Sequence, residues 1–213
     1  MNQLLSKTFL WMFVGLLVTF LTGYIVSINE NMVLSIFGGP IFWLIIILEF
    51  ALVIFFSVRV HKMRPVTAKI CFLLYSFVSG LTFSSVFIGF DVGIVMYVFL
   101  IAAVVFAIFG AIGYFTNVDL NRIGVYLLMG LFAIIICCIV NLFLGNSTFD
   151  LIISIIALLI FFGFTAYDIQ MVKILGNQGI DHDVVAINGA FQLYLDFINI
   201  FLHLLSIIGN SRD

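Results

Sequence analysis

Long apolar stretches alternate with short polar ones along the whole chain. The residues between the apolar stretches are charged or favour turns, as at 29–31, 38–40, 117–122, 145–150 and 173–183. A helix needs roughly 20 predominantly apolar residues to cross a bilayer. The pattern therefore predicts seven membrane-spanning helices, at residues 8–28, 41–58, 70–90, 92–115, 123–144, 151–172 and 184–208.

The composition agrees with this pattern and excludes a water-soluble globular protein. Of the 213 residues, 65% are hydrophobic and 8% are charged, so most of the chain cannot face water. Spans joined by short loops leave no room for a soluble domain. We therefore expect an all-α, polytopic helix bundle that forms a single transmembrane domain over residues 1–213. The formal net charge of −2 gives no basic tract for nucleic acid.

Basic residues are distributed unevenly between alternate loops, which bears on the orientation of the chain. Of the 8 Lys and Arg, one side of the membrane would hold Lys7, Arg59, Lys62, Arg64, Lys69, Arg122 and Lys173, and the other side only Arg212. Basic loops tend to remain in the cytosol. The distribution predicts a cytosolic N-terminus and, after an odd number of spans, a C-terminus on the outside.

Three carboxylates fall within the predicted spans. Glu49 and Asp196 lie well inside their spans, and Asp168 lies about one turn from the cytosolic end of span 151–172. A charge at the centre of a membrane helix costs about 2.5–3.5 kcal/mol on insertion scales, so such residues normally face a bundle interior, a partner or water. They are the leading functional candidates.

Asp196 belongs to a regular series of polar residues in the last predicted span. The series consists of Asn188, Gln192, Asp196, Asn199, His203 and Ser206. At about 100° per residue these positions fall within an arc of roughly 80°. One face of this helix is therefore predicted to be polar, with Asp196 at its centre.

The last two spans are expected to bring Asp168 and Asp196 together. Antiparallel helices joined by a short loop are usually neighbours, and both aspartates lie towards the same membrane surface. Two close carboxylates would share one proton, and the pair would respond to pH. The alternative is that polar residues only join helices by hydrogen bonds, although a neutral Asn would do this without the cost of an ionisable group.

Other polar residues have two interpretations each. Glu49 is either a cation ligand or proton site, or a protonated carboxyl bonded to a neighbouring carbonyl. Arg59 either reaches a carboxylate such as Asp168 or only marks the cytosolic helix end. His203 is expected to be a neutral, hydrogen-bonded histidine rather than a metal ligand. The cluster of Asp181, His182 and Asp183 resembles a divalent-cation site, but it precedes a helix, and Asp183 fits an N-cap. Together with Glu49 and His203, the candidates for an ion pathway are Asn188, Gln192 and Asn199.

Enzymatic activity is not expected. Asp196 lies in YLDF and lacks the GxGD context of intramembrane aspartyl proteases. The chain has no GxSxG or HExxH motif for a serine or zinc protease. A retinal protein needs a lysine in the last span, and 184–208 has none. No cofactor is expected.

The strings AYDIQMVK at 166–173 and LYLDFINIFLHLL at 193–205 resemble the paired C-terminal motifs of the Bax inhibitor-1 family, the transmembrane Bax inhibitor motif proteins. The resemblance covers the whole chain and is greatest to the compact prokaryotic members. It implies a multi-pass protein of the bacterial inner membrane, or of the endoplasmic reticulum membrane for a eukaryotic chain.

The resemblance also implies a function, a calcium leak gated by pH. Asp168 and Asp196 would be the proton-sharing pair at the cytosolic side of the pore, and Arg59 would latch onto them in the closed state. Protons and Ca²⁺ would be the ligands, with Ca²⁺ bound transiently by the two carboxylates. Two alternatives are a proton-coupled cation exchanger and a non-conducting regulator or scaffold that acts through membrane-protein partners.

Overall fold

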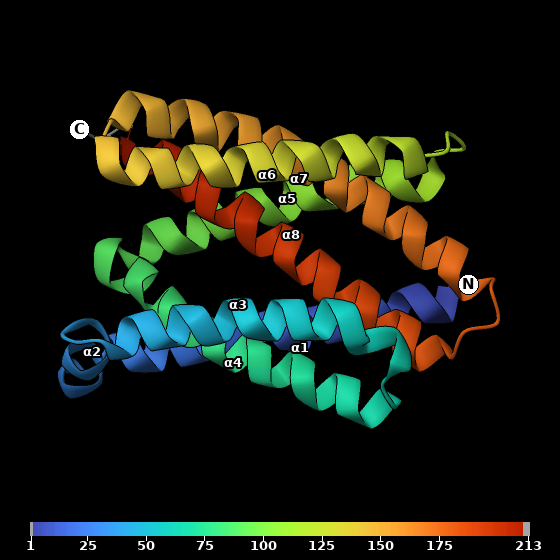
Figure 1. The fold of residues 1–213 in the computed structure, drawn as a ribbon, viewed down its shortest axis with the longest axis horizontal. Coiled ribbons are helices and arrows are strands. Elements are labelled where there is room, and N and C mark those ends of the chain that lie inside the picture. The colour runs from blue at the N-terminus through green and yellow to red at the C-terminus, as the bar shows by residue number, and fades with distance from the viewer. Residues whose placement is uncertain (1, 211–213) are drawn as a thin grey trace. The chain divides into compact units, whose positions relative to one another are not determined.

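The computed structural model describes residues 2–210, which form α-helices and one 3₁₀ turn (Figure 1). In chain order these are α1 (Asn2–Ser27), α2 (Glu30–Phe37), α3 (Ile41–Arg59), η1 (Val60–Lys62), α4 (Pro65–Gly89), α5 (Val92–Phe115), α6 (Asn121–Leu144), α7 (Ser147–Gly176) and α8 (His182–Asn210). The described residues contain no strand. The predicted all-α class is confirmed.

Within residues 2–210, seven helices are long and apolar enough to cross a membrane, and they match the seven predicted spans in order. The short helix α2 was not predicted, because its eight residues are too few to give an apolar period and it has no buried residue. Helix α7 also begins before and ends after the predicted span 151–172. Hydropathy marks only the apolar middle of a helix, whereas capping residues set its ends.

Local sequence explains several of these ends. Asn29 caps α2 by accepting a hydrogen bond from the Met32 N–H at 3.2 Å, and Pro65 starts α4 at a position where a missing N–H costs nothing. Helix α6 ends at Gly145, whose φ of 60° lies in the left-handed region that glycine adopts freely. Asn146 then accepts a hydrogen bond from the Phe149 N–H at 2.9 Å in the first turn of α7.

The chain divides into two compact units. Unit 1 comprises the chain up to Val95 together with Val172–Tyr194, and unit 2 comprises Met96–Met171 together with the chain from Leu195. Helices α7 and α8 are each continuous and contribute one part to either unit.

Unit 1 is built around a cluster of aromatic side chains. Helix α4 packs against both α1 and α3 (Figure 1). The ring of Phe191 in α8 lies 4.3 Å from that of Phe56 in α3 and 5.1 Å from that of Tyr75 in α4, measured between centroids. Phe56, Phe72 and Phe191 are almost completely buried. Such pairs add directional attraction to apolar burial.

Unit 2 relies on close helix packing at small residues. A Cβ placed on Gly113 of α5 would lie 2.6 Å from the Cα of Ala166 in α7, so the two backbones are in contact there. A Cβ on Gly124 of α6 would meet the ring of Tyr167 at 2.7 Å. Small residues that allow backbones to approach in this way are typical of membrane helix interfaces.

Candidate functional site

Asp168 of α7 and Asp196 of α8 face each other in unit 2. Their carboxyl groups lie within hydrogen-bonding reach. The Asp196 side chain is buried, and Asp168 is half-buried. A hydrogen bond between two carboxyl groups requires a proton on one of them, and the sharing of one proton by this pair stays a prediction.

One oxygen of Asp196 receives no N–H or hydroxyl hydrogen bond among the described residues. Among the described residues, Asp196 Oδ2 is buried and has no hydrogen-bond partner. An unsatisfied buried carboxyl oxygen is costly, and native proteins usually retain such a group for a functional reason. The functional interpretation of the pair stays a prediction.

The proximity of the two aspartates follows from the antiparallel register of α7 and α8. Nearer the start of α7 and the end of α8, Ser154 of α7 donates a hydrogen bond to Ser206 of α8 at 3.1 Å. Along α7, 14 residues separate Ser154 from Asp168, and along α8, 10 residues separate Asp196 from Ser206, so the two contacts follow an antiparallel register that is offset by about one turn. Residues of the polar series predicted for the last span therefore meet polar residues of α7 at two levels.

Several contacts fix the turn of α7 that carries Asp168. Gly113 lets α5 approach Ala166, and a Cβ on Gly110 would meet the side chain of Ile169 at 2.9 Å. The buried amide of Gln170 accepts a hydrogen bond from the Leu120 N–H and donates one to the Val118 carbonyl oxygen, both at 2.8 Å. The α5–α6 loop is thereby tied to the turn that carries Asp168.

Sequence reasoning missed Gln170, although it lies in the same AYDIQMVK string as Asp168. An uncharged amide near a helix end gives no strong signal, and its partners are backbone groups 50 and 52 residues away. The available signal was that Gln170 is a polar residue two positions after the intramembrane carboxylate of Asp168.

Glu49 lies in a separate hydroxyl network in unit 1. The Thr82 hydroxyl donates to Glu49 Oε2 at 3.1 Å, and Tyr75 lies within electrostatic range of this carboxylate. The Tyr194 hydroxyl is hydrogen-bonded to the Thr19 hydroxyl at 2.6 Å. Glu49 is half-buried. Its partners in this network are hydroxyls, and the role of Glu49 as an ion or proton site stays a prediction.

The remaining predicted residues differ in their surroundings. Arg59 ends α3 and is exposed, and it belongs neither to the Lys7–Asp183 nor to the Lys69–Asp183 ion pair. Asn188 and Gln192 are half-buried on α8. The Asn199 amide donates to the Leu195 carbonyl oxygen of its own helix at 2.8 Å. The roles assigned to these residues stay predictions.

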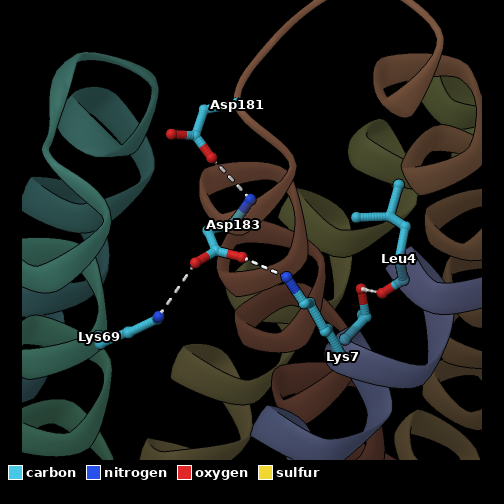
Figure 2. Close-up of polar contacts among 6 residues, drawn as sticks. Leu4, Lys7, Lys69, Asp181 and Asp183 are labelled. Carbon is cyan, nitrogen blue, oxygen red and sulfur yellow. Dashed lines mark hydrogen bonds and ion pairs between the residues drawn. The ribbon is translucent and has the colours of Figure 1, made fainter.

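Asp183 has a different role from the predicted N-cap. Helix α8 begins at His182, and Asp181 provides the cap by accepting a hydrogen bond from the Asp183 N–H at 2.8 Å. The Asp183 carboxylate instead lies between Lys7 of α1 at 2.7 Å and Lys69 of α4 at 3.3 Å (Figure 2). The N-cap prediction was wrong by two residues, because Asp181 and Asp183 carry the same capping group.

No group of three or more His, Cys, Asp or Glu side chains that could hold a metal ion occurs in residues 2–210. Ca²⁺ takes six to eight oxygen ligands, and Asp168 and Asp196 supply only part of such a shell. Chemically, the pair can bind and release a proton and can offer carboxylate oxygens to a cation.

Comparisons with known proteins agree on one family. The model of the family described as "Inhibitor of apoptosis-promoting Bax1" matches residues 1–213. An uncharacterized protein of Borreliella burgdorferi is 38% identical over 100% of this chain and 94% of its own length. The inner membrane protein YbhL of Escherichia coli K12 is 35% identical over 98% of this chain and 92% of its own length.

A third relative is an uncharacterized membrane protein of Streptococcus pyogenes serotype M1, 31% identical over 99% of this chain and 94% of its own length. The relatives and the seven apolar helices agree with the expected localisation, a multi-pass protein of a bacterial inner membrane. The full-length match and the identities above 30% lead to one assignment: the chain belongs to the Bax inhibitor-1 family of membrane proteins.

Proposed function

We propose that this protein is a pH-sensitive calcium-leak channel in which the proton shared by Asp168 and Asp196 controls the conducting path. The observation that carries the proposal is the pair itself, two carboxyl groups within hydrogen-bonding reach in membrane-spanning helices. When the shared proton is present, the hydrogen bond holds α7 to α8. When it is lost, like-charge repulsion separates the two carboxylates.

Calcium fits this pair better than a softer or larger ion would. Ca²⁺ is a hard cation that prefers carboxylate oxygens and accepts an incomplete, flexible shell completed by water. The unpartnered Asp196 Oδ2 offers one such oxygen. Two carboxylates without a complete ligand set suit an ion that passes through better than an ion that stays bound. Arg59 is the proposed counter-charge of the pair in the closed state.

The test is calcium flux into liposomes that contain the purified protein, measured with an enclosed calcium dye over a range of pH. Asn at position 168 or 196 can still donate a hydrogen bond to the remaining carboxylate, but it cannot share a proton. We therefore expect Asp168→Asn and Asp196→Asn to conduct with little or no dependence on pH. Asp119→Asn is the matched control, because Asp119 is exposed and its bond to the Asn121 N–H can be kept by asparagine.

Three outcomes would contradict the proposal. If folded Asp168→Asn and Asp196→Asn proteins keep the wild-type pH profile, the pair is not the sensor. If wild-type flux is saturable and requires an opposing proton gradient, the protein is an exchanger, and if there is no flux, the regulator alternative is favoured.

A further inference from the structure

A second row of hydrogen-bonded polar groups lies in unit 2, nearer the end of α8. Ser206 of α8 donates to Asp150 Oδ2 at 2.8 Å, and Ser154 of α7 donates to the Ser206 hydroxyl at 3.1 Å. His203 Nδ1 lies 3.3 Å from the Ser154 hydroxyl. The four side chains form a continuous series of contacts. It begins at Asp150 in the first turn of α7 and ends at His203, about one turn before Ser206 in α8.

The composition of the row differs from that of a simple helix contact. Both ends are groups that bind protons, a carboxylate and an imidazole, and the two links between them are hydroxyls. A hydroxyl both donates and accepts, and its hydrogen can rotate between the two directions. The Phe161 ring is stacked on the His203 ring, with centroids 6.1 Å apart, and covers one face of the imidazole. Ser154 is buried.

We infer that Asp150, Ser206, Ser154 and His203 form a proton relay that connects the Asp150 end of α7 with the interior of unit 2. A proton that reaches the Asp150 carboxylate is transferred to the Ser206 hydroxyl. Ser206 in turn transfers its hydroxyl proton to Ser154, and Ser154 transfers its hydroxyl proton to Nδ1 of His203. The result is a carboxylate at Asp150 and an imidazolium at His203, with both serines restored. The reverse sequence returns the proton.

The charged and titratable groups around the relay are few. Asp150 is the acidic group that acts on His203, and Cys138 of α6, next to Cys137, lies within electrostatic range of Asp150. Burial disfavours a positive charge on the imidazole, whereas the Asp150 carboxylate favours it. From His203 to Asp196 the distance along α8 is about 10 Å, so the relay is separate from the aspartate pair and does not depend on the proposed calcium leak.

The experiment follows the protonation of His203 directly. His61 and His182 are replaced by glutamine, the remaining histidine is labelled with ¹³C in the ring, and the protein is placed in lipid nanodiscs. A rapid pH jump is followed by infrared spectroscopy of the imidazole. We expect Ser154→Ala and Ser206→Ala to slow the protonation of His203 by about tenfold or more, since each 1.4 kcal/mol added to a barrier gives a factor of ten.

Matched variants separate a relay from a structural contact. Ser206→Thr keeps a hydroxyl and should restore the wild-type rate, whereas Asp150→Asn removes the carboxylate that receives the proton and should slow it. Ser27→Ala removes a hydroxyl that bonds only to the Tyr24 carbonyl oxygen on α1, and its rate should not change. The final extent of protonation should be equal in the two serine-to-alanine variants and the wild type.

The inference is wrong if both alanine variants protonate His203 at the wild-type rate, or if His203 never changes its protonation in the pH range where the protein stays folded. Circular dichroism of each variant identifies misfolding. Because the measurement needs no calcium flux, a chain that does not conduct can still pass this test, and a conducting chain can fail it.

Discussion

At the scale of the residue, Gln170 shows how one buried side chain connects a functional turn to the rest of its unit. Both polar ends of its amide bond to backbone groups of the α5–α6 loop, at Leu120 and Val118. Because the side chain is buried, water cannot easily replace either bond. Gln170 lies half a turn from Asp168 on the same helix, so the loop it holds also limits how far that aspartate can move.

We predict that Gln170→Ala destabilises the protein by about 1–3 kcal/mol, because it leaves a partly buried N–H and a carbonyl oxygen without partners. The measurement is thermal unfolding of purified protein in detergent. Gln178→Ala is the control, since Gln178 is exposed in the α7–α8 loop, and its stability should remain within the error of the wild type. Equal melting temperatures for the two variants would show that the loop is held by other contacts.

Individual residues were predictable to the extent that their signal was local. Asp168 and Asp196 were identified because a carboxylate inside an apolar span is unusual in itself, and their helices are neighbours in sequence. Gln170 and Asp150 were not identified as partners of distant groups. Gln170 bonds to loop backbone, and Asp150 bonds to Ser206 from a position that looks like an ordinary polar helix start.

At the scale of the element, the contact between α5 and α7 depends on one missing methyl group. The backbone of α7 at Ala166 occupies the space in which a side chain of residue 113 would begin. Two helices in such close contact cannot move apart or slide by a small amount without losing it. The turn carrying Asp168 follows directly after Ala166, so its position is set by this contact.

We therefore expect Gly113→Ala to destabilise the protein by about 1–3 kcal/mol, the usual cost of overpacking. Gly89→Ala is the matched control, because a Cβ there would have no atom within 4 Å, and its effect should stay within about 0.5 kcal/mol. Unfolding in detergent measures both. A stable Gly113→Ala protein would mean that α5 moves away from α7 without cost.

The elements themselves were more predictable than their contacts. Hydropathy identified the order and number of the membrane helices, since about 20 apolar residues leave few alternatives in a bilayer. It did not identify α2, whose eight residues are partly polar, or the true ends of α7. Nor did it identify the contact at Gly113, because a glycine at an interface and one facing lipid look the same in sequence.

At the scale of the whole molecule, the basic residues predict the orientation in the membrane. Seven of the eight Lys and Arg fall on the side of the N-terminus, which favours a cytosolic N-terminus. We expect alkaline phosphatase fused to the C-terminus to be active and green fluorescent protein fused there to be dark in bacterial cells. The opposite result for the pair of reporters would reverse the orientation and place the Asp150 end of α7 in the cytosol.

The polar face of α8 has a consequence for how the protein is made. With a mean hydropathy of 1.6, α8 has the lowest value of the seven candidate spans, against 2.4 for α7. A segment that carries Asp196, His203 and several amides partitions poorly into lipid by itself. It leaves the ribosome after the other six described spans. We therefore expect α8 to insert together with α7, whose polar groups can pair with those of α8 at the translocon. The contacts that hold the two helices together in the folded protein would then also allow them to enter the membrane as a hairpin.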